Sequence, residues 1–240
     1  MRRVSRIILP LLCFVAGYVD SCMFLALFGL FVAQVTGSLV IVGTQLVVLK
    51  SAALLRFAEI FAFFFAGVAT TLVITSAEGR RRNARTSALA LEGVLLTGLL
   101  ILWILNGPWE PNTPIVVFAS LLGLSAMGVQ SAFVRLLIQD SPSTNVMTTN
   151  ITQFAIDTTE LVLGRWPRRH MQTNTTAAEH AEIERRLTEL WSVLLSFFLG
   201  TLIGAAAYIW LDLWCALLPI AIISVLCVRA ALSAESLQMN

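Results

Sequence analysis

Long apolar runs separated by short polar stretches dominate this 240-residue chain. A helix needs about 20 residues to cross a bilayer core of about 30 Å. Six apolar blocks reach or approach that length, and two further blocks are of similar length but more polar. The six are Ile7–Gly29, Phe57–Ser76, Ser87–Leu105, Pro114–Leu136, Glu189–Trp210 and Leu213–Arg229, and the two more polar blocks are Phe31–Leu49 and Thr144–Leu163.

This pattern predicts an all-α fold, a polytopic bundle of transmembrane helices. Backbone that crosses lipid must satisfy its own hydrogen bonds, which a helix does within one segment. No block alternates apolar and polar residues with the period of two that a membrane strand requires. Composition agrees, because 58% of the residues are hydrophobic and only 12% are charged, against about 25% charged in soluble domains.

Arginine clusters predict the orientation of the chain. They lie at residues 2–6, 80–85 and 165–186, and the positive-inside tendency places all three in the cytoplasm. An even number of crossings then separates each cluster from the next, yet three blocks lie between neighbouring clusters. The N- and C-termini are both predicted to be cytoplasmic. The net charge of +2 is too small to favour a nucleic-acid partner.

Of the three blocks between each pair of neighbouring arginine clusters, one is therefore predicted not to cross the membrane. The two polar blocks, Phe31–Leu49 and Thr144–Leu163, are the candidates, as re-entrant or half-length helices beside six full spans. This arrangement places 14 Lys and Arg residues inside and 2 outside, whereas eight full spans place 11 inside and 5 outside. Six spans are favoured, and eight full spans are the alternative.

The three blocks before the second arginine cluster resemble the three blocks after it in sequence. This resemblance predicts two repeats, 1–112 and 113–240, with a cytoplasmic polar loop at 164–188. Because each half holds three crossings, the second repeat would be inverted relative to the first, as in many transporters. The aligned segments are Ala16–Ser21 with Ala126–Ser131, Val35–Ser38 with Met147–Asn150 after a two-residue insertion, and Phe64–Gly67 with Phe197–Gly200.

Five short features carry a resemblance to a known family: GYVD at 17–20, VTGS at 35–38, GVQSA at 128–132, VMTTN at 146–150, and Asp157. With these features the chain resembles the DUF1275 (YoaK-like) bacterial membrane proteins over about Leu11 to Val228. The resemblance implies a multi-pass protein of the bacterial inner membrane and supplies no established activity. The chain departs from the family pattern at three polar positions, Ser38, Ser131 and Thr149-Asn150.

A carboxylate deep in a span is costly unless it faces protein or water. Asp20 lies 13 residues beyond Ile7, about 20 Å along a helix. We expect it to bind a solute or a proton, with a structural partnership to a neighbouring helix as the alternative. The full set of predicted pathway residues comprises Asp20, Gln34, Thr36, Gly37, Ser38, Gln130, Asn145, Thr148, Thr149, Asn150, Gln153 and Asp157.

These residues predict a small-solute transporter or permease whose pathway lies at the interface of the repeats. The expected partners are the lipid bilayer and a small polar or ionic solute, with protons as the candidate coupling ion and the oligomeric state left open. The alternative is a non-transporting scaffold or partner-binding subunit, in which polar side chains only hold helices together. Glu92 is expected to play a structural role, paired with Arg85.

Signatures of catalysis and of cofactor binding are absent from the sequence. It has no phosphate-binding glycine loop, no HExxH and no nucleophile elbow, so no enzyme, cofactor or metal is predicted. The four cysteines, Cys13, Cys22, Cys215 and Cys227, all fall inside apolar blocks without metal-ligand spacing. We interpret them as small apolar core residues.

Overall fold

The computed structural model describes residues 2–48, 53–79, 83–111, 113–138, 141–164 and 177–238, and within them every regular element is a helix. Each predicted block produces a helix, because long apolar blocks without interior breaks favour continuous helix in lipid. The elements are α1 (Arg2–Ala26), α2 (Val35–Val47), α3 (Ala53–Gly79), α4 (Ala84–Asn106), α5 (Pro114–Leu137), α6 (Met147–Gly164), α7 (Ala177–Leu211), the 3₁₀ turn η1 (Asp212–Ala216) and α8 (Leu217–Gln238).

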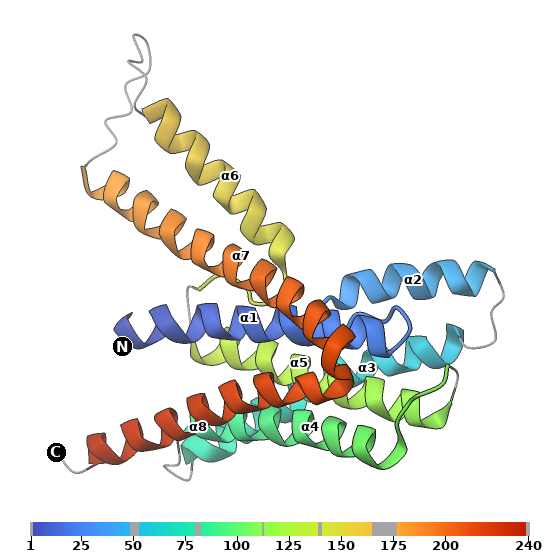
Figure 1. Ribbon diagram of the computed structural model, residues 1–240. Coiled ribbons are helices and arrows are strands. Elements are labelled where there is room, and N and C mark those ends of the chain that lie inside the picture. The colour runs from blue at the N-terminus through green and yellow to red at the C-terminus, as the bar shows by residue number, and fades with distance from the viewer. Residues whose placement is uncertain are drawn as a thin grey trace.

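By length and composition, five stretches of the described residues are suited to crossing a membrane: Ile7–Ala26, Ile60–Glu78, Ala84–Asn106, Pro114–Leu137 and His180–Ser233. The last of these is 54 residues long. It holds α7 and α8 joined by η1, and the two helices run in opposite directions (Figure 1). The chain is thus a helical membrane protein, as its composition predicts.

The helices form one bundle with two projections. Helices α1, α3, α4, α5 and α8 lie alongside one another, with both chain termini at the same end (Figure 1). At that end α6 and the first half of α7 diverge together from the bundle, whereas α2 extends along the opposite end beside α3. The two shorter helices, α2 and α6, therefore occupy opposite ends of the molecule.

Small residues allow the central helices to approach closely. Gly200 and Gly204 of α7 lie against the backbone of α1, and an added Cβ would collide with the carbonyl oxygens of Phe14 and Tyr18 respectively. In the other half, Gly128 of α5 lies against the Phe63 carbonyl of α3. Such contacts are the usual basis of helix association in lipid. Helix α1 is the most enclosed of the spanning stretches.

The polar segment predicted as a loop at 164–188 is helical from Ala177 onward. Arg185 binds Glu182 and Glu189 at spacings of three and four residues, the spacing at which charges on a helix meet. The polar turns of α7 are thereby continuous with its apolar part, and the other polar residues, 165–176, lie outside the described residues.

Candidate functional site

Asp20 joins the end of α1 to the start of α2. Its side chain is buried, and Oδ1 accepts hydrogen bonds from the backbone N–H groups of Val32 (2.8 Å) and Ala33 (2.7 Å). The chain reverses between these points through Phe28 and Gly29, both in the left-handed region at φ 56° and 92°. A carboxylate that accepts two N–H groups forms strong, charge-assisted bonds, so Asp20 fixes the non-helical backbone that precedes α2.

The first turn of α2 collects the predicted residues of the first repeat. Gln34 is the residue at its N-cap, and its carbonyl accepts from the backbone of Gly37 and Ser38. The Ser38 hydroxyl is fully buried and donates to the carbonyl of Phe31 at 2.7 Å. Thr36, in the same turn, is exposed. The structure therefore brings Asp20, Gln34 and Ser38 to one loop and leaves Thr36 outside that network.

An equivalent loop precedes α6. Asn145 is buried, and its Nδ2 donates to the carbonyl of Met127 on α5 at 3.3 Å. Asn150 is also buried and donates to the carbonyl of Ser143 at 2.7 Å. Two side-chain amides hold this loop in place, whereas a carboxylate and a hydroxyl hold the loop that precedes α2. Thr148 and Thr149 are exposed on α6.

Gln130 connects the two halves. It is fully buried in α5, and its Nε2 donates to the carbonyl of Leu12 on α1 at 3.0 Å. Its Oε1 has no hydrogen-bond partner among the described residues. A buried amide oxygen without a partner retains the capacity to accept one hydrogen bond.

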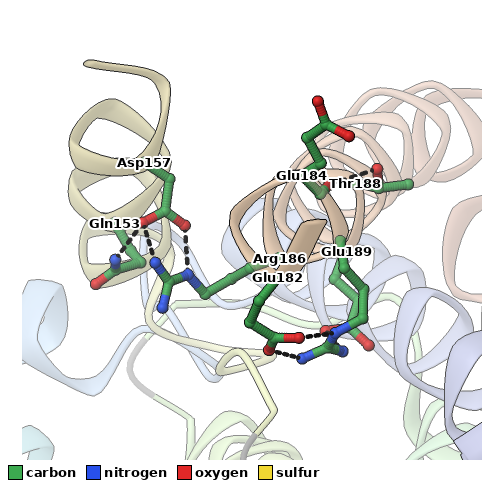
Figure 2. Close-up of polar contacts among 8 residues, drawn as sticks. Gln153, Asp157, Glu182, Glu184, Arg186, Thr188 and Glu189 are labelled. Atoms are coloured by element: carbon green, nitrogen blue, oxygen red, sulfur yellow. Dashed lines mark hydrogen bonds and ion pairs between the residues drawn. The ribbon is translucent and has the colours of Figure 1, made fainter. Parts of the chain in front are cut away.

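Asp157 binds Arg186 rather than the residues around Asp20 (Figure 2). Its side chain is fully buried, and the guanidinium donates to it through Nε and Nη2, both at 2.6 Å. Gln153 donates to the same carboxylate at 2.7 Å. This bidentate pair fastens α6 to α7. Gln153 and Asp157 are both among the predicted pathway residues, whereas Arg186 is not, since its only signal is membership of the arginine cluster at 165–186.

Glu92 contradicts its predicted pairing with Arg85. The carboxyl group is fully buried in α4, and neither oxygen has a hydrogen-bond partner among the described residues. A bare carboxylate in an apolar interior is strongly disfavoured. The predicted pair with Arg85 is therefore wrong, and the apolar block that contains Glu92 gives no local signal that this carboxyl lacks a partner in the described part of the chain.

Two cavities lie near the ends of the bundle. One, of about 380 Å³, is lined mainly by Leu9 and Pro10 of α1, by Ser141, and by residues of α7 from Arg185 to Val193. The other, of about 620 Å³ and widely open, surrounds the turn between α7 and α8 and includes Leu25, Tyr208, Trp210 and Asp212. None of the twelve predicted pathway residues lines either cavity.

The family comparison agrees with the resemblance in the sequence. The model of a family described as "Protein of unknown function (DUF1275)" matches residues 8–229, which is nearly the whole chain. No curated protein and no solved structure matches it. Apolar helices, the buried polar loops before α2 and α6, and this match together identify the chain as a multi-pass helical membrane protein of the DUF1275 family.

Proposed function

We propose that this protein is a small-solute transporter of the bacterial inner membrane, with six membrane-crossing helices and with α2 and α6 as re-entrant or half-length helices. Helix α2 has 13 residues, which span about 20 Å and fall short of the hydrocarbon thickness. The 54-residue stretch His180–Ser233 supplies two crossings, because its helices run in opposite directions. Both termini then face the same side, which the arginine clusters assign to the cytoplasm.

Equivalent contacts at aligned positions support the inverted repeat. Ser38 aligns with Asn150, and each donates to the carbonyl seven residues before it, that of Phe31 and that of Ser143. The helix pairs match as well, since α1 packs on α7 as α5 packs on α3, and α2 packs on α3 as α6 packs on α7. Exchanging the halves reproduces these pairings, as a pseudo-twofold relation requires.

The buried loops before the two short helices carry the transporter proposal. Val32, Ala33, Thr144 and Asn145 are all buried, although their backbone is not helical. Non-helical backbone at membrane depth is tolerated only inside protein or beside a water-filled cavity. In transporters with inverted repeats, interrupted helices of this kind place free N–H groups and polar side chains at the solute site.

In this proposal the pathway residues fall into two groups, one at the loops before the short helices and at the contact of α5 with α1, and one between α6 and α7. Asp20, Gln34 and Ser38 hold the loop before α2, Asn145 and Asn150 hold the loop before α6, and Gln130 joins α5 to α1 across the two repeats. Asp157 and Gln153 control how α6 sits against α7. Asp20 is the candidate for proton or cation coupling, because neutralising its carboxylate would weaken the bonds to Val32 and Ala33 and release the loop before α2.

Flux through the purified protein tests the proposal. The protein is reconstituted into liposomes and assayed with labelled amino acids, sugars, nucleobases and alkali cations, with and without an imposed pH gradient. We expect one of these classes to accumulate above the level of empty liposomes, and Asp20→Asn to abolish or uncouple that flux at normal protein content. Flux by Asp20→Asn equal to that of the wild type would remove its proposed role.

One observation favours a second candidate function, a membrane scaffold or partner-binding subunit. The inner polar residues bind neighbouring backbone groups, and the two cavities are lined by other residues. A scaffold predicts that Asp20→Asn lowers stability or abundance, and that no solute class crosses liposomes containing folded wild-type protein.

A further inference from the structure

Two of the four cysteines face each other in a pocket separate from the main core. The Sγ atoms of Cys22 on α1 and Cys215 in η1 are 3.4 Å apart, although 193 residues separate them in the sequence. Both side chains are buried, together with Tyr18. Cys13 and Cys227, in contrast, have no cysteine partner.

Hydrogen bonds hold the backbone at Cys215 and the thiol of Cys22. The Tyr18 hydroxyl donates to the Cys215 carbonyl at 2.9 Å, and the Cys22 thiol lies 3.2 Å from the carbonyl of Gly204, which it can donate to. Gly204 lies on α7, against the backbone of Tyr18. The packing of α1, α7 and η1 holds the two sulfurs in contact at 3.4 Å, and a disulfide between them would shorten this separation to about 2.05 Å.

We propose that Cys22 and Cys215 form a disulfide that ties the end of α1 to the turn between α7 and α8. This turn lies away from the end that carries both termini (Figure 1). With the termini in the cytoplasm, the pair lies in the outer half of the membrane, on the side where disulfides persist. The inference goes beyond the proposed function, because the sulfur geometry does not depend on any solute.

Thiol–disulfide exchange supplies the chemistry, with a dithiol–disulfide oxidoreductase or another disulfide as the oxidant. One cysteine loses its proton and attacks a sulfur of the donor, which expels a thiolate that takes up a proton. The second cysteine then attacks this mixed disulfide, forms the Cys22–Cys215 bond and releases the second donor thiol. Two electrons and two protons pass from the protein thiols to the donor, which ends fully reduced.

The test uses the full chain in membranes, with Cys13→Ser and Cys227→Ser as the background that keeps only the proposed pair. Membranes are treated with copper phenanthroline, denatured in SDS with N-ethylmaleimide, reduced, and labelled with maleimide–polyethylene glycol. We expect most chains to gain two labels, and reduction before blocking to remove both. A parallel sample without oxidant reports the state in cells grown aerobically, where we expect the same two labels.

Matched controls separate the pair from general oxidation. The reverse variant, Cys22→Ser with Cys215→Ser, keeps Cys13 and Cys227 and should gain no label. Size-exclusion chromatography in detergent checks that each variant is folded. The proposal is overturned if folded protein with the pair gains no label after oxidation, if its disulfide joins two chains on a non-reducing gel, or if the untreated cells contain only thiols.

Discussion

At the scale of single residues, Asp20 is the side chain on which the start of α2 depends. Its carboxylate satisfies two backbone N–H groups that would otherwise be buried without partners. Buried donors that lose their acceptor cost about 1–3 kcal/mol each. The contacts that would make Asp20 a coupling site therefore also give it a structural role. Comparing the stability of different substitutions at Asp20 distinguishes the two roles.

We expect Asp20→Leu to lower the free energy of unfolding by at least about 2 kcal/mol, since it leaves two N–H groups unpaired. Asp20→Asn should lower it less, because the amide oxygen can still accept. Unfolding by SDS in mixed micelles, followed by tryptophan fluorescence, measures both. Glu110→Gln is the matched control, an exposed carboxylate whose loss should change little. Equal stability of Asp20→Leu and the wild type would contradict the capping role.

For Glu92 we expect the opposite result, that its replacement by an apolar residue does not lower the free energy of unfolding. A buried carboxyl without a partner costs free energy, and apolar groups of similar volume often replace buried charged groups without loss. Glu92→Leu should therefore be at least as stable as the wild type in the same unfolding assay, whereas Glu92→Lys should fail to fold. A loss of more than about 1 kcal/mol in Glu92→Leu would reveal a polar partner for this carboxyl.

At the scale of elements, the bidentate pair between Asp157 and Arg186 holds α6 to α7. A double-mutant cycle with Asp157→Asn and Arg186→Gln should give a coupling of about 1–2 kcal/mol, since one partner is fully buried. The control cycle uses Glu182 and Arg185, whose side chains are 58% and 41% exposed. We expect about 0.5 kcal/mol or less there, and equal couplings would contradict a special role for the pair at Asp157.

Helix packing allows a further comparison, because Gly200 and Gly67 are aligned in the proposed repeats. A Cβ at Gly200 collides with the Phe14 carbonyl, whereas at Gly67 nothing lies within 4 Å. Gly200→Ala should therefore separate α1 from α7 and lower the melting temperature of the detergent-solubilised protein by several degrees. Gly67→Ala should be neutral or slightly stabilising. A neutral Gly200→Ala would show that the two helices can move apart freely.

The sequence predicts these elements well and their contacts poorly, for physical reasons. Long apolar blocks favour helix, and each of the eight α-helices in the described part of the chain overlaps a predicted block. Within the polar loop predicted at 164–188, the capping box Thr176-x-x-Glu179 predicts the start of a helix, and α7 begins at Ala177, with ion pairs around Arg185 that favour helix there. Asp157 and Arg186 are 29 residues apart, and no local signal chooses that arginine from its cluster.

At the scale of the whole molecule, the account depends on the direction of each helix. In the proposed arrangement neither α2 nor α6 crosses the membrane, so each half holds three crossings and the second half is inverted relative to the first. If α2 and α6 crossed fully, the arginines at 80–85 would face the outside. The position of the loops relative to the membrane therefore decides between the two arrangements.

Cysteine accessibility in intact cells measures those positions most directly. Single cysteines are placed at Val48, Glu110 and Ser141 in a cysteine-free background, and a membrane-impermeant maleimide is applied before and after permeabilisation. The account predicts labelling of Val48→Cys and Glu110→Cys in intact cells, and of Ser141→Cys only after permeabilisation. The reverse pattern, with Ser141→Cys labelled from outside and the other two protected, would contradict it, because eight full spans or the opposite orientation of the chain would then apply.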